Sequence, residues 1–123
     1  LIVLGDEFTE IAGIALGQRL LEQDKPFSAI IAGNDLLALG CIFALESAGL
    51  VCPADVSVIG FNNMPYLSLF RTPLTTIAIP RMEMGNIAAD VILNRLMSPE
   101  EPLKNITVTP ELIERGSTSI AKI

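Results

Sequence analysis

The fold of this chain is decided by residues 29–63, which read AIIAGNDLLALGCIFALESAGLVCPADVSVIGFNN. Two short apolar runs, residues 28–32 and 56–59, have the β-branched character of strands that are covered on both faces of a sheet. The segment between them, residues 35–47, is long enough for a helix, and Gly49 stands where a helix ends. A strand–helix–strand unit of this length predicts a parallel sheet with a right-handed crossover.

Polar pairs follow both predicted strands, Asn34–Asp35 after the first and Asn62–Asn63 after the second. Ligands of open parallel sheets collect beyond the carboxyl ends of the strands, so we expect these pairs to lie side by side at one rim. Asn34 can cap the following helix or bind a hydroxyl-bearing ligand through its amide. Asp35 is expected to be structural, and Asn63 to be a turn residue that tolerates a left-handed backbone.

Composition limits the class of protein. The chain has 123 residues, enough for one small domain with a core, and half of them are hydrophobic, which favours an apolar face shared with a partner. The net charge is −6 and the eight basic residues are scattered. Nucleic-acid binding needs clustered Lys and Arg, so this chain by itself is not expected to bind DNA. Residues 36–45 form the longest apolar run, which is too short for a bilayer that needs roughly 20 residues.

Catalytic and metal chemistry find little support in the sequence. The chain has no histidine, which excludes Ser-His-Asp and Cys-His arrangements, and neither GxxxxGK[ST] nor GxGxxG occurs. Cys41 and Cys52 form no CxxC and no metal pair, and Cys41 is expected to be a buried thiol in mid-helix. We therefore expect no enzyme activity, no metal and no cofactor.

The remaining segments are predicted from local patterns. Residues 1–4 read as a strand, and Thr9 as the cap of a helix whose apolar stripe continues to Leu21. Gly13 and Gly17 share one face of that helix, which suggests a close backbone approach. Further along we expect a helical turn at 64–70, an extended segment at 75–79, a helix that opens at Pro80, and short strands at 106–109 and 112–114. The start carries no basic-then-apolar leader, and because the chain does not begin with Met we expect an upstream part.

Four motifs in this order, GNDLLALG, ESAGLVCPADVSVIGFNN, TPLTTIAIPRMEMG and PELIERGST, resemble the effector-binding core of the LacI/GalR family of bacterial transcription regulators. The resemblance covers nearly the whole chain, from about residue 1 to 119. It implies an α/β, periplasmic-binding-protein-like (Rossmann-like) parallel sheet with flanking helices, as part of a two-lobed receptor. Residues 1–79 would belong to the C-terminal lobe, residues 80–109 to the N-terminal lobe, and residues 110–123 would form a return strand and tail.

The same resemblance implies a function. The chain would sense a small-molecule effector, such as a sugar, a sugar derivative or another small polar metabolite, and would form a homodimer. DNA would be bound only through an upstream helix-turn-helix that is not in this chain, and the protein would be cytoplasmic with no membrane partner. The alternative is a periplasmic solute (sugar)-binding protein, which shares the fold. The TPLTTI segment and the PELIERGST tail favour the regulator. A third reading is an isolated dimerisation module without a ligand.

Five positions match ligand contacts of the family. Phe8 would stack on the effector ring, although a core Phe is an equal alternative, and Asn34 would contact the effector. Asn62 stands where many members carry an Asp that binds sugar hydroxyls, and its amide lacks the charge that strengthens such bonds. Ile79 stands where several members carry a polar residue, and Arg81 would be a charged donor from the other lobe or a solvated residue at a helix start.

These departures make the visible part of the pocket less acidic than a simple sugar requires. We therefore expect a polar effector with an apolar or anionic part. By the same resemblance, Leu39 and Phe70 would lie in a two-fold dimer interface, and the alternative for both is the core of their own chain.

Overall fold

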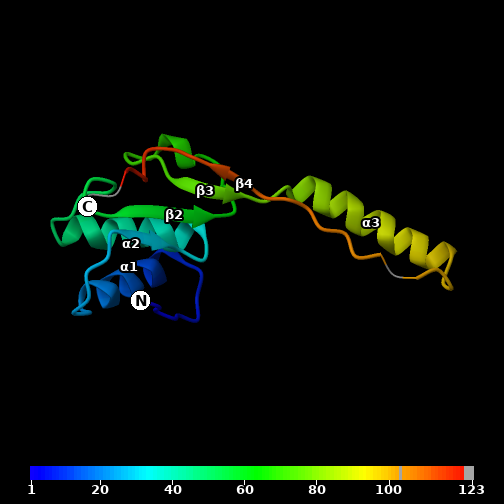
Figure 1. Ribbon diagram of the computed structural model, residues 1–123, viewed down its shortest axis with the longest axis horizontal. Coiled ribbons are helices and arrows are strands. Elements are labelled where there is room, and N and C mark those ends of the chain that lie inside the picture. Colours follow the sequence, from blue (N-terminus) through cyan, green and yellow to red (C-terminus); the bar gives the residue numbers. More distant parts are fainter. Residues whose placement is uncertain (103, 121–123) are drawn as a thin grey trace. The chain divides into compact units, whose positions relative to one another are not determined.

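The computed structural model describes residues 1–102 and 104–120, which fall into two compact units (Figure 1). The core unit comprises Leu1–Ala78 and Leu112–Ile123, and the helical unit comprises Ile79–Glu111. The elements follow in the order α1 (Glu10–Leu21), β1 (Ala29–Ile31), α2 (Asp35–Ser47), β2 (Ser57–Phe61), the short 3₁₀ helix η1 (Leu67–Leu69), β3 (Thr75–Ala78), α3 (Arg81–Met97) and β4 (Glu111–Ile113).

The four strands form one sheet in the order β1-β2-β3-β4, so β1 lies at an edge. Strand β1 pairs with β2 in parallel, with Ile31 opposite Ile59, and β2 pairs with β3 in parallel, with Ile59 opposite Thr75. The predicted parallel strand–helix–strand unit is therefore confirmed. Each strand is displaced from its predicted range by a residue or two, as is usual for element ends.

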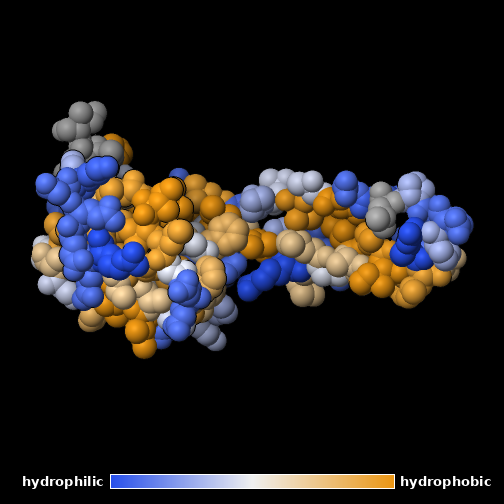
Figure 2. Space-filling view, turned by 90° about the horizontal axis from the view of Figure 1, so that it is seen from below, coloured by the Kyte–Doolittle hydropathy of each residue, from blue (hydrophilic) through white to orange (hydrophobic). Residues whose placement is uncertain are grey.

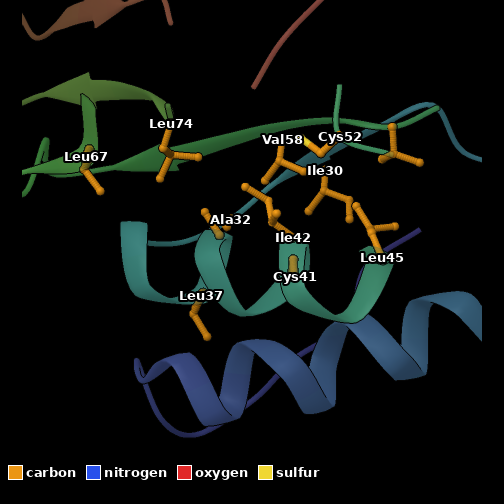
Figure 3. Close-up of a cluster of buried hydrophobic side chains, with 12 residues drawn as sticks. Ile30, Ala32, Leu37, Cys41, Ile42, Leu45, Cys52, Val58, Leu67 and Leu74 are labelled. Carbon is orange, nitrogen blue, oxygen red and sulfur yellow. The ribbon is translucent and has the colours of Figure 1, made fainter. Parts of the chain in front are cut away.

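Helix α2 has the predicted bounds because its two ends are encoded locally. Asn34 caps it, since its Oδ1 accepts a hydrogen bond of 2.8 Å from the Leu37 amide. Gly49, just past its end, has a φ of +80°, which suits glycine. Figure 3 shows α2 between α1 and the sheet, with Leu37 pointing toward α1 and the buried Ile30 and Val58 pointing from the strands toward α2. The core of the unit thus lies mainly between α2 and the sheet.

Helices α1 and α2 approach each other through glycines, as the Gly13 and Gly17 pair predicts. A Cβ added to Gly13 would lie 2.5 Å from the backbone oxygen of Leu37, and one added to Gly17 would lie 2.8 Å from the Cβ of Ala44. On α2, Gly40 lies at the same contact. The three atoms nearest to a Cβ added there are all backbone atoms of α1. This contact needs the absence of side chains on both helices.

Two predicted strands are wrong. Residues 1–4 form no strand: Leu1, Ile2 and Val3 line an open groove of about 350 Å³ beside β1 and form no ladder with it. Residues 106–109 are irregular as well. Both runs have β-branched residues, but a strand also needs a neighbouring edge within hydrogen-bonding distance, and local sequence does not supply one.

The expectation that both sheet faces are covered is also wrong for the described residues. Burial alternates along β2, where Val58 and Gly60 are buried and Ile59 is only partly so, and Ile31 of β1 is 79% exposed. The helices α1 and α2 lie on one side of the sheet (Figure 1). On the other side, Ile31 of β1 is open to solvent and Ile59 of β2 is partly so, whereas both faces of β3 are covered at Thr75 and Thr76.

The helical unit contains the predicted helix after Pro80, and it has no buried residue in α3. Its apolar side chains are accordingly exposed, among them Met82 at 80%, Leu96 at 74% and Met97 at 82%. Figure 2 shows hydrophobic areas in orange on both units.

The two cysteines are buried and unpaired, and we expect them to be chemically inert. Desolvation by burial raises the pKa of the Cys41 thiol and of the Cys52 thiol from the ordinary 9.0 to about 11. The reactive thiolate at pH 8 is then about a hundredfold rarer than in the unfolded chain. Alkylation by iodoacetamide at pH 8 should be slower by at least about that factor in the native protein than in urea.

The same pKa shifts make the stability of the native state depend on pH. The unfolded thiols ionise near pH 9 and the native thiols only near pH 11, so the native state loses stability as the pH rises through this window. In the alkylation experiment above, equal rates with and without urea would contradict the burial of the two thiols.

Candidate functional site

The two polar corners lie side by side at one rim of the sheet, as the sequence predicts. They follow the carboxyl ends of the neighbouring parallel strands β1 and β2, which remain paired there through the Ala32 amide and the Ile59 carbonyl at 2.9 Å. Asp35 of the first corner accepts a hydrogen bond of 2.8 Å from the Met64 amide of the second. In open parallel sheets this rim is the usual place for a ligand.

Asn34 and Phe8 are brought together at the first corner. The Asn34 Oδ1 serves as the helix cap, and its Nδ2 donates a hydrogen bond of 3.0 Å to the Phe8 carbonyl. The Phe8 side chain is 64% exposed, so the alternative that it is a core residue is wrong. An exposed aromatic ring beside a half-buried amide offers stacking and hydrogen bonding to a ligand.

Asp35 is structural, as expected. It is completely buried, and its carboxylate accepts from the Met64 amide at 2.8 Å and from the Thr76 hydroxyl at 2.5 Å. The negative end of the side chain also lies at the N-terminus of α2, where the helix dipole favours it. Asp35 thereby joins the first corner, the second corner and β3.

The second corner has an unusual backbone at two consecutive residues. Asn63 has a φ of +50°, which confirms its left-handed assignment, and Asn62 has a φ of +109°, which was not predicted. Their amides donate to the Ile77 carbonyl at 2.9 Å and to the Thr76 hydroxyl at 3.3 Å. The side-chain amide of Asn62 is half-buried and makes no hydrogen bond to any residue that the structure describes. That amide is therefore available to a ligand.

Ile79 and Arg81 belong to the helical unit, at its start. Ile79 is half-buried and accepts a hydrogen bond of 2.8 Å from the Arg81 amide, and the Arg81 side chain is exposed. The three candidates of the core unit, Phe8, Asn34 and Asn62, thus share one rim, and the role of the other two stays a prediction.

The predicted interface residues differ in exposure. Leu39 is half-buried against the core, and Phe70 is 46% exposed. Exposed apolar side chains accompany them: Phe43 lies four residues after Leu39 on the same face of α2 and is 57% exposed, and Leu69 is 77% exposed. An interface at these residues stays a prediction, and it now includes Phe43 and Leu69.

Sequence reasoning missed the polar residues that hold the rim together. Thr75, Thr76 and Ser117 are fully buried, and Arg115 hydrogen-bonds to three residues far away in sequence. The Ser117 hydroxyl donates to the Val58 carbonyl at 2.6 Å and accepts from the Thr75 amide at 2.8 Å. A signal was present, because hydroxyl residues in an otherwise apolar strand such as LTTI must find partners when they are buried.

A groove of about 350 Å³ lies beside β1 in the core unit. Its lining includes Leu16, Leu20 and Ile30 and extends to Ala32 and Gly33, but it includes neither Asn34 nor Asn62. Among the described residues, no three His, Cys, Asp or Glu side chains gather where they could hold a metal ion. Likewise, no described helix is long and apolar enough to cross a membrane.

The two bonds of Asn34 can be separated by substitution. Asn34→Ala should destabilise the protein by about 1 kcal/mol, because it removes the cap of α2 and the bond to the Phe8 carbonyl. Asn34→Ser retains a capping oxygen and loses only the bond to the Phe8 carbonyl, so it should cost only a few tenths of a kcal/mol. Urea unfolding measures both. An equal loss in the two variants would contradict the capping role.

Comparison with known proteins agrees with this geometry. The periplasmic binding protein-like domain family matches residues 2–118. The HTH-type transcriptional repressor PurR of Edwardsiella ictaluri is 37% identical over 118 residues, which are 96% of this chain and 34% of the repressor. A LacI family regulator from Enterococcus faecium, solved with bound ribose, has a TM-score of 0.83 and 34% identity over 99% of this chain and 45% of that one. A LacI family regulator from an Arthrobacter species, solved in complex with lactose, has a TM-score of 0.79 and 29% identity over 92% of this chain and 43% of that one.

The fold and the family match define the class: the chain belongs to the periplasmic binding protein-like domain family. Its relatives are transcriptional regulators, and they identify the chain more closely as part of an effector-binding domain of the LacI/GalR type. The predicted family and fold class are thus confirmed, and the regulator is favoured over the periplasmic transport receptor. The chain spans 34% of the length of the curated relative and less than half of each solved regulator.

Proposed function

We propose that this chain senses a small polar effector within a LacI/GalR-type transcription regulator. The observation that carries the proposal is the rim where Asn34 and Asn62 stand at the ends of adjacent parallel strands, with an unbonded Asn62 amide. The two solved regulators hold ribose and lactose, which are ligands of the kind such amides bind.

The ligand chemistry follows from the side chains at the rim. Asn34 and Asn62 offer neutral amides that donate and accept, and Phe8 offers an exposed ring. Neither corner presents a free carboxylate, because the Asp35 carboxylate is buried and already accepts two hydrogen bonds. This composition favours a hydroxyl-bearing ligand with an apolar or anionic part, to which Arg81 would add a charged donor.

The effector acts in this proposal by shifting a population. The core unit belongs to one lobe and residues 80–109 to the other, and a ligand that prefers one arrangement of the lobes favours that arrangement by its differential affinity. DNA is bound by a separate helix-turn-helix segment, in keeping with the name of the PurR relative. The protein works in the cytoplasm, as a homodimer and without catalysis.

Thermal shift of the complete regulator tests the proposal. We expect ribose, ribose 5-phosphate, guanine, lactose or glucose to stabilise it, by about 2.7 kcal/mol for a ligand present at a hundred times its Kd. Asn62→Ala should abolish the shift, and Asn105→Ala, at an exposed position, should preserve it. No shift with any of these compounds would contradict the effector role. Tightest stabilisation by glucose would contradict the preference for an anionic or apolar part.

The dimer gives a second prediction. Phe70→Ala and Leu39→Ala should each weaken self-association of the complete regulator by about tenfold or more, because each removes apolar surface that the proposed interface would bury. Ile11→Ala, at an exposed position of α1, is the matched control. Sedimentation at low concentration measures the effect, and unchanged sedimentation of both variants would rule out this surface.

A further inference from the structure

The corner at Asn62 and Asn63 combines an uncommon backbone conformation with several long-range hydrogen bonds. Two consecutive non-glycine residues have φ values of +109° and +50°. Such conformations are sparsely populated, and they persist only where the surroundings determine them. The structure shows three backbone anchors at this corner: the Asn62, Asn63 and Met64 amides donate to Ile77, Thr76 and Asp35.

A fourth anchor comes from the opposite end of the chain. The Arg115 Nη2 donates a hydrogen bond of 2.8 Å to the Asn63 Oδ1, and its Nη1 donates one of 2.7 Å to the Leu74 carbonyl. The Arg115 amide donates to the Thr75 hydroxyl at 2.9 Å. Arg115 is half-buried. Through these bonds it connects the corner after β2 to the beginning of β3.

The bridge acts on the side chain of Asn63, which none of the other anchors contacts. A planar guanidinium presents two N–H groups in a fixed fork, so one arginine can hold two acceptors at a set separation, whereas a lysine ammonium cannot. Asn63 is in turn adjacent to Asn62, whose side-chain amide has no partner among the described residues. Whatever fixes the Asn63 backbone also fixes where the Asn62 amide stands.

We propose that Arg115 is a positioning residue that holds the left-handed Asn62–Asn63 corner and thereby places the Asn62 amide for the effector. That the corner serves an effector rests on the proposed function. That Arg115 fixes the corner does not rest on it. Arg115 acts through Asn63 and need not touch the ligand itself.

Hydrogen exchange in the complete regulator tests the hold on the corner. In Arg115→Met, peptides that cover residues 62–66 should exchange about tenfold faster, because a hydrogen bond from a charged donor is lost. Arg115→Lys should be almost as fast, because it keeps the charge but loses the fork. Arg71→Met, at an exposed arginine of the same unit, should leave the corner unchanged. Peptides from α2 should keep the wild-type rate in all three variants.

Three results would overturn the hold: unchanged exchange at residues 62–66 in Arg115→Met, a wild-type rate in Arg115→Lys, or equal acceleration in α2 and at the corner. Asn63→Ala provides the same test if Arg115→Met fails to fold. It removes the same hydrogen bond from the other side and leaves the bonds of Arg115 to Leu74 and Thr75 in place. It should loosen the corner by a similar factor.

Titration with ribose, ribose 5-phosphate and guanine tests the link to the effector. The compound that binds the wild type should bind Arg115→Met about tenfold more weakly, at the same stoichiometry, and Arg71→Met with unchanged affinity. A loosened corner with unchanged affinity would overturn the positioning role. If none of these compounds binds the wild type, the proposed function fails, and the exchange rates still decide whether Arg115 holds the corner.

Discussion

Gly40→Ala should destabilise the protein by about 3 kcal/mol, the largest effect that we expect from a single added methyl group. A Cβ at this position would collide with the Glu10 carbonyl oxygen and approach the Ile14 amide nitrogen, which are both backbone atoms of α1. Backbone inside a helix cannot move aside as a flexible side chain can, so α1 must separate from α2. Because α2 carries the Asn34 corner at its N-terminus, the rim should also be disturbed.

Gly85→Ala is the matched control, since it also places alanine inside a helix. No atom lies within 4 Å of the Cβ that it would add, so the substitution should stabilise α3 by up to about 1 kcal/mol. Urea unfolding of the complete regulator followed by circular dichroism measures both variants. If Gly40→Ala were as stable as the wild type, the close contact between α1 and α2 would be refuted.

Asp35→Ala should cost about 2–6 kcal/mol, because it leaves two buried donors without acceptors, at roughly 1–3 kcal/mol for each. These donors are the Thr76 hydroxyl and the Met64 amide. Asp35→Asn keeps the shape and one acceptor oxygen, so its cost should be about half as large. Asp24→Ala, at an exposed position of the same unit, should change the stability by no more than about 0.5 kcal/mol.

Effector affinity adds a second measurement to the Asp35 series. Asp35 joins α2 to the Asn62–Asn63 corner, so Asp35→Asn should weaken binding of whichever test compound stabilises the wild type. The result that refutes the structural role is an Asp35→Ala variant no less stable than Asp24→Ala.

The elements that sequence predicted well are those with local determinants. Helix α2 follows from the cap at Asn34, the apolar residues after it and the glycine at position 49, all within one short segment. Helix α1 follows from the Thr9 cap in the same way. The adjacency of the two corners required one general rule of parallel sheets and no further information.

The errors have a common cause, because each depended on contacts distant in sequence. Residues 1–4 have the composition of a strand, but they face β1 across a groove instead of pairing with it. The Asn63–Arg115 bond joins residues 52 positions apart, and the Thr76–Asp35 bond joins residues 41 apart. No local pattern distinguishes an arginine that braces a turn from one that is solvated.

The edge position of β1 affects how this polypeptide must be handled. Among the described residues, β1 pairs with a strand on one side only; its other side borders the open groove, and Ile31 is 79% exposed. This is the arrangement onto which extended peptides add as an extra strand, and it promotes intermolecular association. Produced without a covering segment, the 123-residue piece should therefore form oligomers through edge-to-edge growth, at a rate that rises with protein concentration.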